Sequence, residues 1–141
     1  MKALSMRHPS VSALLAGHRS VEVRSHRANH SGELLIHASA TFGPTERQEL
    51  ERLRSLGLDL PEPSPEQRGA LVGTAVLAGC HEMLPDDWDR ALLPPRDGEW
   101  YAWELEDVEE FPEPIPYPGR VFLFDVPDQV LAQAVSAFTN P

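Results

Sequence analysis

The segment LAGHRSVEVR, residues 15–24, carries the clearest structural signal in the chain. Gly17 ends a short apolar helix that we expect to contain Pro9 in its first turn. Beyond Gly17 apolar and polar residues alternate, which predicts a half-buried strand over Arg19–Arg24, because successive strand side chains point to opposite faces. Its polar face presents a hydroxyl, a carboxylate and a guanidinium about 7 Å apart. These three side chains are Ser20, Glu22 and Arg24.

Short strands and few helices surround this segment. The run of apolar residues at 34–36 predicts a strand buried on both faces over Gly32–Ser39. The spacing of three leucines predicts an amphipathic helix over Pro44–Leu56. Acidic and proline-rich segments between the elements are interpreted as loops. Further strands are expected at Ala3–Met6, Ala70–Gly79, Trp100–Leu105 and Arg120–Val126, and a last helix from Pro127 through Val135. The pattern favours an α+β fold built on a small barrel, with the first helix and the polar strand face at its mouth.

Length and composition narrow the class of protein. A chain of 141 residues predicts one domain over 1–141, and Leu, Ile, Val and Phe make up about a quarter of it, enough for a packed core. The longest apolar run, Leu71–Cys80, is too short to span a membrane. Cys80 is the single cysteine, so no intrachain disulfide forms, and we expect a cytoplasmic protein with no membrane partner.

Charge is distributed unevenly along the chain, whose net charge is −10. Residues 1–32 hold five lysines or arginines against Glu22 alone, whereas residues 81–128 hold fourteen acids against three arginines. The acidic total argues against a protein that coats nucleic acid without discrimination. We therefore expect any anionic partner to approach the N-terminal basic segment, which includes Arg7, Arg19, Arg24 and Arg27.

Residue types also limit the chemistry. Lys2 is the only lysine, and arginine stays protonated at ordinary pH, so the arginines are expected to bind anions and not to shuttle protons. His26 and His30 are four residues apart, but that spacing brings two imidazoles together only on a helix, and this segment is expected to be a loop. We expect no metal site and no cofactor.

Three segments together resemble the ASCH domain, a branch of the PUA-like barrels associated with RNA and nucleotide recognition. Residues 3–9, ALSMRHP, resemble the family's opening Ser-x-Arg-Gln-Pro, with His8 in place of glutamine. Residues 17–24 are similar to its Gly-x-Lys-Thr-x-Glu-x-Arg signature, and residues 32–38, GELLIHA, follow. The third segment comprises Val72–Gly73, Trp103 and residues 119–124. The resemblance spans nearly the whole chain and implies a PUA-like β-barrel with a binding cleft.

Both the resemblance and the charge pattern point to binding of RNA or a nucleoside-like ligand, with DNA left open. In this interpretation Arg7, Arg19 and Arg24 contact phosphate or sugar, and Ser20 with Glu22 reads a base edge. An ion pair between Glu22 and Arg24 or Arg7 that only supports the barrel is the structural alternative. His37 is either a core histidine or a pocket donor. The full set of expected ligand-binding residues is Ser5, Arg7, His8, Arg19, Ser20, Glu22, Arg24, Arg27, His37 and Trp103.

A hydrolase is the competing hypothesis, acting on RNA or on a modified nucleoside. One branch resembling this domain removes the acetyl group of N4-acetylcytidine, using the motif lysine and a threonine three residues later. Arg19 and Glu22 stand at those two positions, so the proton-transferring amine and the hydroxyl nucleophile are both missing. We therefore expect a binding module rather than an enzyme, and catalysis would require Ser20 with Glu22.

Overall fold

The computed structural model describes residues 1–132 and is built on one mixed sheet of six strands. The strand order is β2-β5-β4-β3-β1-β6, and only the β1/β3 pair is parallel. The strands are β1 (Lys2–Met6), β2 (Val21–Arg24), β3 (Gly32–Ala38), β4 (Ala70–Glu82), β5 (Tyr101–Pro116) and β6 (Leu123–Asp125). The sheet forms a half-barrel, which confirms the predicted α+β class with a small, partly closed barrel.

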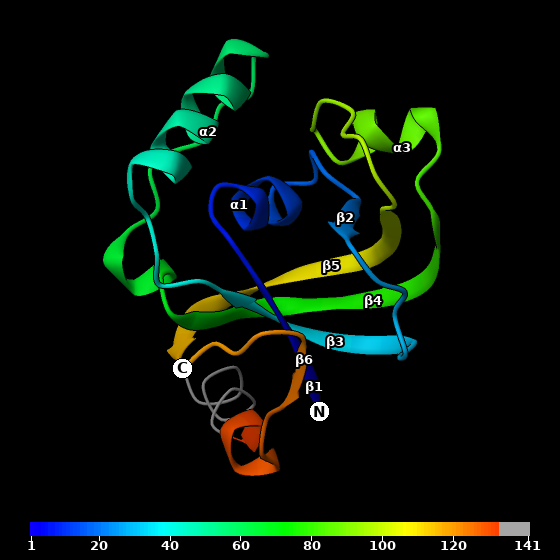
Figure 1. Ribbon diagram of the computed structural model, residues 1–141. Coiled ribbons are helices and arrows are strands. Elements are labelled where there is room, and N and C mark those ends of the chain that lie inside the picture. The colour runs from blue at the N-terminus through cyan, green and yellow to red at the C-terminus, as the bar shows by residue number, and fades with distance from the viewer. Residues whose placement is uncertain (133–141) are drawn as a thin grey trace.

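Helices lie on both sides of this sheet. Helices α1 (Ser10–Leu15), α2 (Pro44–Ser55) and α3 (Pro85–Arg90) lie above β4 and β5 in Figure 1. Residues 128–132 are helical and lie on the opposite side, below β1 and β6 (Figure 1). The rest of the expected final helix, through Val135, falls outside the described residues. None of the helices in residues 1–132 is long and apolar enough to cross a membrane.

Alternation along the strands divides the core into two layers. On β1, Leu4 and Met6 pack with α1 and with the main apolar cluster, whereas Ala3 belongs to a second cluster on the other face. On β3 the same alternation places Ile36 in the first cluster and Leu35 in the second. Val130 and Leu131 pack against the second cluster, so these two residues cover part of the face that α1 leaves open.

Several predicted elements are confirmed, with boundary differences. The strands at Ala3–Met6 and Gly32–Ser39 and the helix at Pro44–Leu56 match β1, β3 and α2 within one residue at each end. The predicted strand over Arg19–Arg24 begins two residues later, at Val21. The strand expected at Arg120–Val126 is reduced to β6, because Phe122 adopts a φ of 63°, which lies outside the range of strand residues.

The prediction of loops in the acidic and proline-rich segments was wrong in two places. Helix α3 lies where an acidic loop was expected, and β5 continues to Pro116 through residues interpreted as a proline-rich loop. β5 tolerates its prolines for two reasons. Only residues 101–104 pair with β2, so within residues 1–132 the second half pairs with a strand on one side only, and its register against β4 shifts between Leu71 and Gly73. Proline is accepted at edges and bulges, where no ladder hydrogen bond is lost.

Candidate functional site

A cleft of about 820 Å³ opens where the half-barrel fails to close. One wall is the edge strand β2, and the other consists of the end of β1 and the segment that leads into β6. The side chains between these walls come from segments far apart in sequence. They include Ser5, Arg7, His8, Arg19, Glu22, Arg24, His37, Arg96, Gly119, Arg120 and Phe122.

Glu22 holds two arginines together within one wall of the cleft. Its Oε1 accepts from Arg19 Nη2 at 2.7 Å and from the Val23 amide at 3.2 Å, and its Oε2 accepts from Arg24 Nη2 at 3.0 Å. The Arg19 side chain is only 3% exposed and the Glu22 side chain 10%. Burial alone would raise the pKa of Glu22, but the charges and hydrogen bonds of Arg19 and Arg24 outweigh burial, so that its pKa lies below the ordinary 4.5. Glu22 is therefore an ionised acceptor at neutral pH.

Arg19 lies beneath the cleft surface, and two of its three guanidinium nitrogens are hydrogen-bonded within the protein. Its Nε donates to the Ala91 carbonyl at 3.1 Å, in addition to the bond to Glu22. Its Nη1 is buried and has no hydrogen-bond partner among residues 1–132. A buried donor without a partner is costly, so a water or ligand oxygen at the bottom of the cleft would be stabilised there.

Arg24 connects the two walls of the cleft. From the edge strand β2 its Nη2 donates to the backbone carbonyl of Ser5 on β1 at 2.8 Å, as well as to Glu22. Its guanidinium lies over the ring of Trp103, 5.8 Å from the ring centroid. Its Nη1 and Nε have no partner among the described residues, and its side chain is 22% exposed. Arg24 can therefore donate single hydrogen bonds from Nη1 or Nε to an anion in the cleft, whereas its Nη2 is already used within the protein.

The remaining charges around the cleft leave it positive. Arg7, Arg96 and Arg120 are exposed, and none of them forms an ion pair with a carboxylate in residues 1–132. The acids of the cleft are already engaged, because Glu46 accepts from the Gly43 amide at 3.1 Å and Glu49 pairs with Arg52 at 2.5 Å. The arrangement therefore favours an anionic group in the cleft, on a protein that is otherwise acidic.

Ser5 and His37 meet at one end of the cleft, on neighbouring parallel strands whose register pairs them directly. Ser5 Oγ lies 3.0 Å from His37 Nδ1, and His37 Nε2 lies 2.6 Å from the carbonyl oxygen of Tyr117. Burial lowers the pKa of His37, and the hydrogen bond to the Tyr117 carbonyl offsets this only in part. His37 is thus a core histidine, 1% exposed, that also lines the cleft, and its role as a donor to a ligand stays a prediction.

The other predicted site residues fall in different places. His8 lines the cleft but is 3% exposed, with its ring nitrogens engaged by Ser12 Oγ at 3.1 Å and the Gln67 carbonyl at 2.7 Å. Ser20 does not line the cleft, because it precedes β2 and its backbone pairs with Arg90 and Leu105. Arg27 and Trp103 line a smaller neighbouring cavity of about 420 Å³, which shares Phe122 with the cleft.

Sequence reasoning missed the cleft residues that come from the acidic half. Arg96 and Arg120 belong to the segment interpreted as repelling polyanions, and Gly119 lies against the imidazole of His37. A Cβ at residue 119 would lie 2.6 Å from His37 Cε1 and 3.2 Å from Ser5 Oγ. The one local signal was that residues 114–124 contain Arg120 and no acid.

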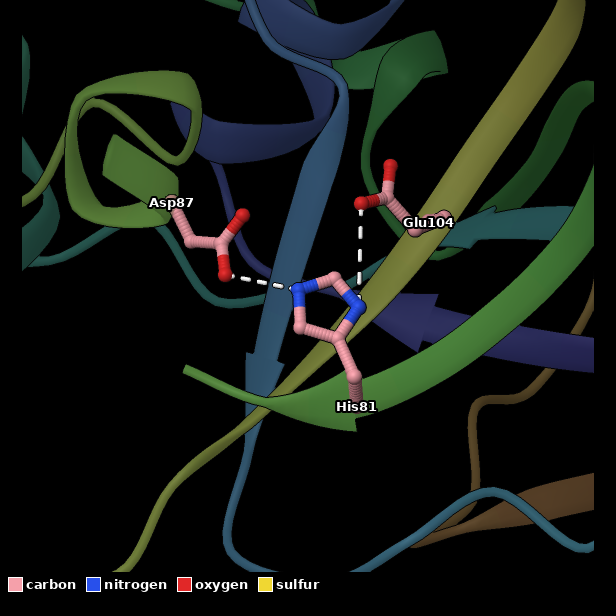
Figure 2. A group of neighbouring side chains, drawn as sticks. All are labelled: His81, Asp87 and Glu104. Carbon is pink, nitrogen blue, oxygen red and sulfur yellow. Dashed lines mark hydrogen bonds and ion pairs between the residues drawn. The ribbon is translucent and has the colours of Figure 1, made fainter. Parts of the chain in front are cut away.

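A second cluster of titratable groups lies outside the cleft. Figure 2 shows the imidazole of His81 between two carboxylates, with Nε2 2.7 Å from Asp87 Oδ2 and Nδ1 3.9 Å from Glu104 Oε1. The three ligand-type atoms lie within 4.8 Å of one another. Arg90, however, pairs with both carboxylates and supplies the positive charge that a metal ion would bring. We therefore interpret the cluster as a link between β4, α3 and β5 that holds the Ala91 carbonyl against Arg19.

Comparison with known proteins identifies relatives of the whole fold. The model of the ASCH domain matches residues 4–115. An ASCH protein from Zymomonas mobilis has a similar structure, with a TM-score of 0.62 and 14% identity over 96% of this chain and 93% of that one. A serine-to-alanine mutant of that protein gives a TM-score of 0.60 at 14% identity, over 96% and 94% of the two chains. A tyrosine-to-phenylalanine mutant gives 0.59 at 14% identity, over 96% of each chain. No curated protein matches the sequence.

Proposed function

Because the chain belongs to the ASCH family, a PUA-like family linked to RNA binding, we propose that its arginine-lined cleft binds RNA or a nucleoside-like anion. One observation carries this proposal: an acidic protein places Arg7, Arg96 and Arg120, all without carboxylate partners in the described chain, around one cleft. Unpaired cations repel one another, and a polyanion would relieve that repulsion.

The residues take different parts in this proposal. Arg7, Arg24 and Arg120 contact phosphate, because their free guanidinium donors face the cleft. Glu22 and Arg19 hold Arg24 in place and supply one buried donor, instead of reading a base directly. Phe122, 59% exposed and placed between the cleft and the smaller cavity, offers a ring on which a base can stack.

Binding is favoured over the acetylcytidine-type hydrolysis considered above. The two positions that would carry that chemistry, Arg19 and Glu22, bond to each other at 2.7 Å inside the protein wall. Ser20, the other nucleophile considered, does not line the cleft. These residues are suited to position a ligand-binding arginine and not to attack a substrate.

Titration of the protein into a short fluorescein-labelled single-stranded RNA tests the proposal. Arg7→Ala and Arg120→Ala should each weaken binding about tenfold, the effect of losing one charge-assisted contact, and should leave the melting temperature nearly unchanged. Arg47→Ala is the matched control, because Arg47 pairs with Glu62 on the outer side of α2 and does not line the cleft. It changes the net charge equally and should alter affinity by about twofold or less. Equal effects of all three substitutions would contradict binding in the cleft.

A further inference from the structure

The pair formed by Ser5 and His37 has a use that ligand binding by the arginines does not require. A carbonyl oxygen only accepts hydrogen bonds, so the 2.6 Å contact to the Tyr117 carbonyl places the imidazole proton on His37 Nε2. In neutral His37 the Nδ1 atom is then an acceptor, and the hydroxyl of Ser5 donates to it across 3.0 Å. The contacts therefore fix the hydroxyl as the donor and the imidazole as the base.

The surroundings keep this pair ready for proton transfer. Burial favours the neutral form of His37, so at neutral pH the imidazole is uncharged and can accept a proton. The ring is held from both sides, by the Tyr117 carbonyl and by an edge contact with Phe124 at 5.9 Å between centroids. Gly119 approaches the pair so closely that a Cβ there would lie 2.6 Å from His37 Cε1 and 3.2 Å from Ser5 Oγ, so no side chain fits beside the two groups.

A positive charge lies against the backbone of Ser5. Arg24 Nη2 donates to the backbone carbonyl of Ser5 itself, so the guanidinium is adjacent to this residue, and its Nη1 and Nε have no partner within residues 1–132. Such free donors stabilise negative charge that develops on a substrate oxygen. Nucleophile, base and a cationic group thus line the same cleft, and Ser5 contacts both of the other two residues.

A second serine–histidine pair in the same protein shows which feature matters. Ser12 Oγ lies 3.1 Å from His8 Nδ1, and His8 Nε2 lies 2.7 Å from the Gln67 carbonyl, which repeats the bonding pattern of Ser5 and His37. Ser12, however, does not line the cleft, whereas Ser5 does. Position at the cleft next to Arg24, rather than the hydrogen-bond pattern alone, distinguishes Ser5.

We propose that Ser5 and His37 form an acyl-transfer centre that hydrolyses carboxylic esters carrying a negative charge. Ser5 Oγ forms a bond to the ester carbonyl carbon, its proton passes to His37 Nδ1, and the carbonyl electron pair moves to the oxygen, which Arg24 stabilises. The C–O bond to the alcohol then breaks, and the alcohol takes the proton from His37. Water next attacks the acyl-Ser5, again losing a proton to His37 Nδ1. The acid leaves and Ser5 Oγ regains that proton.

The same geometry limits the substrate class. A backbone carbonyl, and no carboxylate, faces His37 Nε2, so the imidazolium that forms during attack gains little stabilisation. A base of this kind supports leaving groups that depart readily, which favours esters over amides. The arginines around the cleft favour esters whose acid or alcohol part is anionic. The centre lies in the cleft of the proposed function but does not depend on RNA being its ligand.

Labelling and turnover together test the acyl-transfer centre. A fluorophosphonate probe should attach to Ser5 and not to Ser12, as located by peptide mass spectrometry. The 4-nitrophenyl monoester of succinic acid should show a burst of nitrophenolate followed by slower turnover. Ser5→Ala should abolish the burst, and His37→Gln should slow acylation by about a hundredfold or more. Ser12→Ala, the matched control, should retain both burst and label.

Two further measurements test the centre even if Ser5→Ala or His37→Gln fails to fold. Ser5→Cys retains a nucleophile, so its alkylation by iodoacetamide should be faster than in the Ser5→Cys, His37→Gln double variant. The acylation rate of the natural protein should fall as pH decreases through a value below 6.5, because the pKa of His37 lies below that ordinary value and only the neutral ring accepts the proton. Label found on other residues, an undiminished burst in Ser5→Ala, or equal alkylation rates would overturn the centre.

Failure of this centre can be told apart from failure of RNA binding. The two proposals have separate readouts, because the phosphate contacts are assigned to Arg7, Arg24 and Arg120 and the ester chemistry to Ser5 and His37. RNA binding without ester turnover would overturn only the acyl-transfer centre. Ester turnover with Arg7→Ala and Arg120→Ala binding RNA like the natural protein would overturn only the proposed function.

Discussion

Among single residues, Glu22 is the group on which the cleft wall depends. Its carboxylate is almost fully buried and satisfies Arg19 and Arg24 together. Removing the charge of one partner from a buried ion pair leaves the others uncompensated, which is costly. Arg24 would lose one of the two bonds that hold it across the cleft. Glu22 therefore links the stability of the fold to the position of Arg24.

Glu22→Gln should lower the free energy of unfolding by about 3 kcal/mol at pH 7. Because the pKa of Glu22 is below the ordinary 4.5, the stability it contributes is present above that pH and is lost as pH falls through the lower, folded-state value. The difference in unfolding free energy between the natural protein and Glu22→Gln should therefore become smaller in acid. Urea unfolding at a series of pH values measures this difference.

Glu51→Gln serves as the control for that measurement. Glu51 pairs with Arg54 on α2 and is 73% exposed, so its loss should change stability by about 0.5 kcal/mol or less. If Glu22→Gln lost as little unfolding free energy as Glu51→Gln, the buried network would contribute nothing to folding.

Among the strands and helices, the pairing of β4 with β5 determines the shape of the half-barrel. The two strands shift register three times along their length, so β5 can curve round and present its first residues to β2. Gly73 lies at one of these shifts, where a Cβ would meet the Glu109 carbonyl oxygen at 2.3 Å. Only glycine permits this approach of the two backbones.

Gly73→Ala should lower the free energy of unfolding by about 1–3 kcal/mol, because backbone atoms must move to admit the methyl group. Gly79→Ala on the same strand is the matched control, since a Cβ there meets nothing within 4 Å. Thermal unfolding of both variants checks the expectation. A loss for Gly79→Ala equal to that for Gly73→Ala would point to a general effect of replacing glycine in β4.

Taken as a whole, the protein has a net charge of −10 and a cleft lined by arginines. Such a distribution admits few phosphates, because those beyond the cleft meet the acids of β5 and its flanking segments. If the cleft engages about three phosphates of a single strand, the logarithm of the RNA association constant should fall with the logarithm of salt concentration at a slope of about −2 to −3. Fluorescence titrations over a range of salt concentrations measure it. A slope near zero with retained binding would show that an uncharged part of the ligand dominates.

Elements whose pattern of apolar and polar residues lies within one segment could be predicted from the amino-acid sequence. Alternation over residues 20–24 and the apolar run at 34–36 identified β2 and β3, because burial of one or both faces of a strand depends on its own side chains. The motifs around these strands also indicated the ASCH family, and that resemblance implied a binding cleft. The nearness of Glu22 and Arg24 followed from their spacing alone.

Which distant residues meet is a property of the folded chain. Ser5 reaches His37 through the register of β1 against β3, and Arg120 joins Arg7 at the cleft because β6, which follows Arg120, pairs with β1. β5 extends through its prolines because β4 supplies backbone partners and a bulge where they are needed. Register, closure of the sheet and edge position are relations between segments, set by the packing of the whole chain, and the side-chain pattern of any one segment does not contain them.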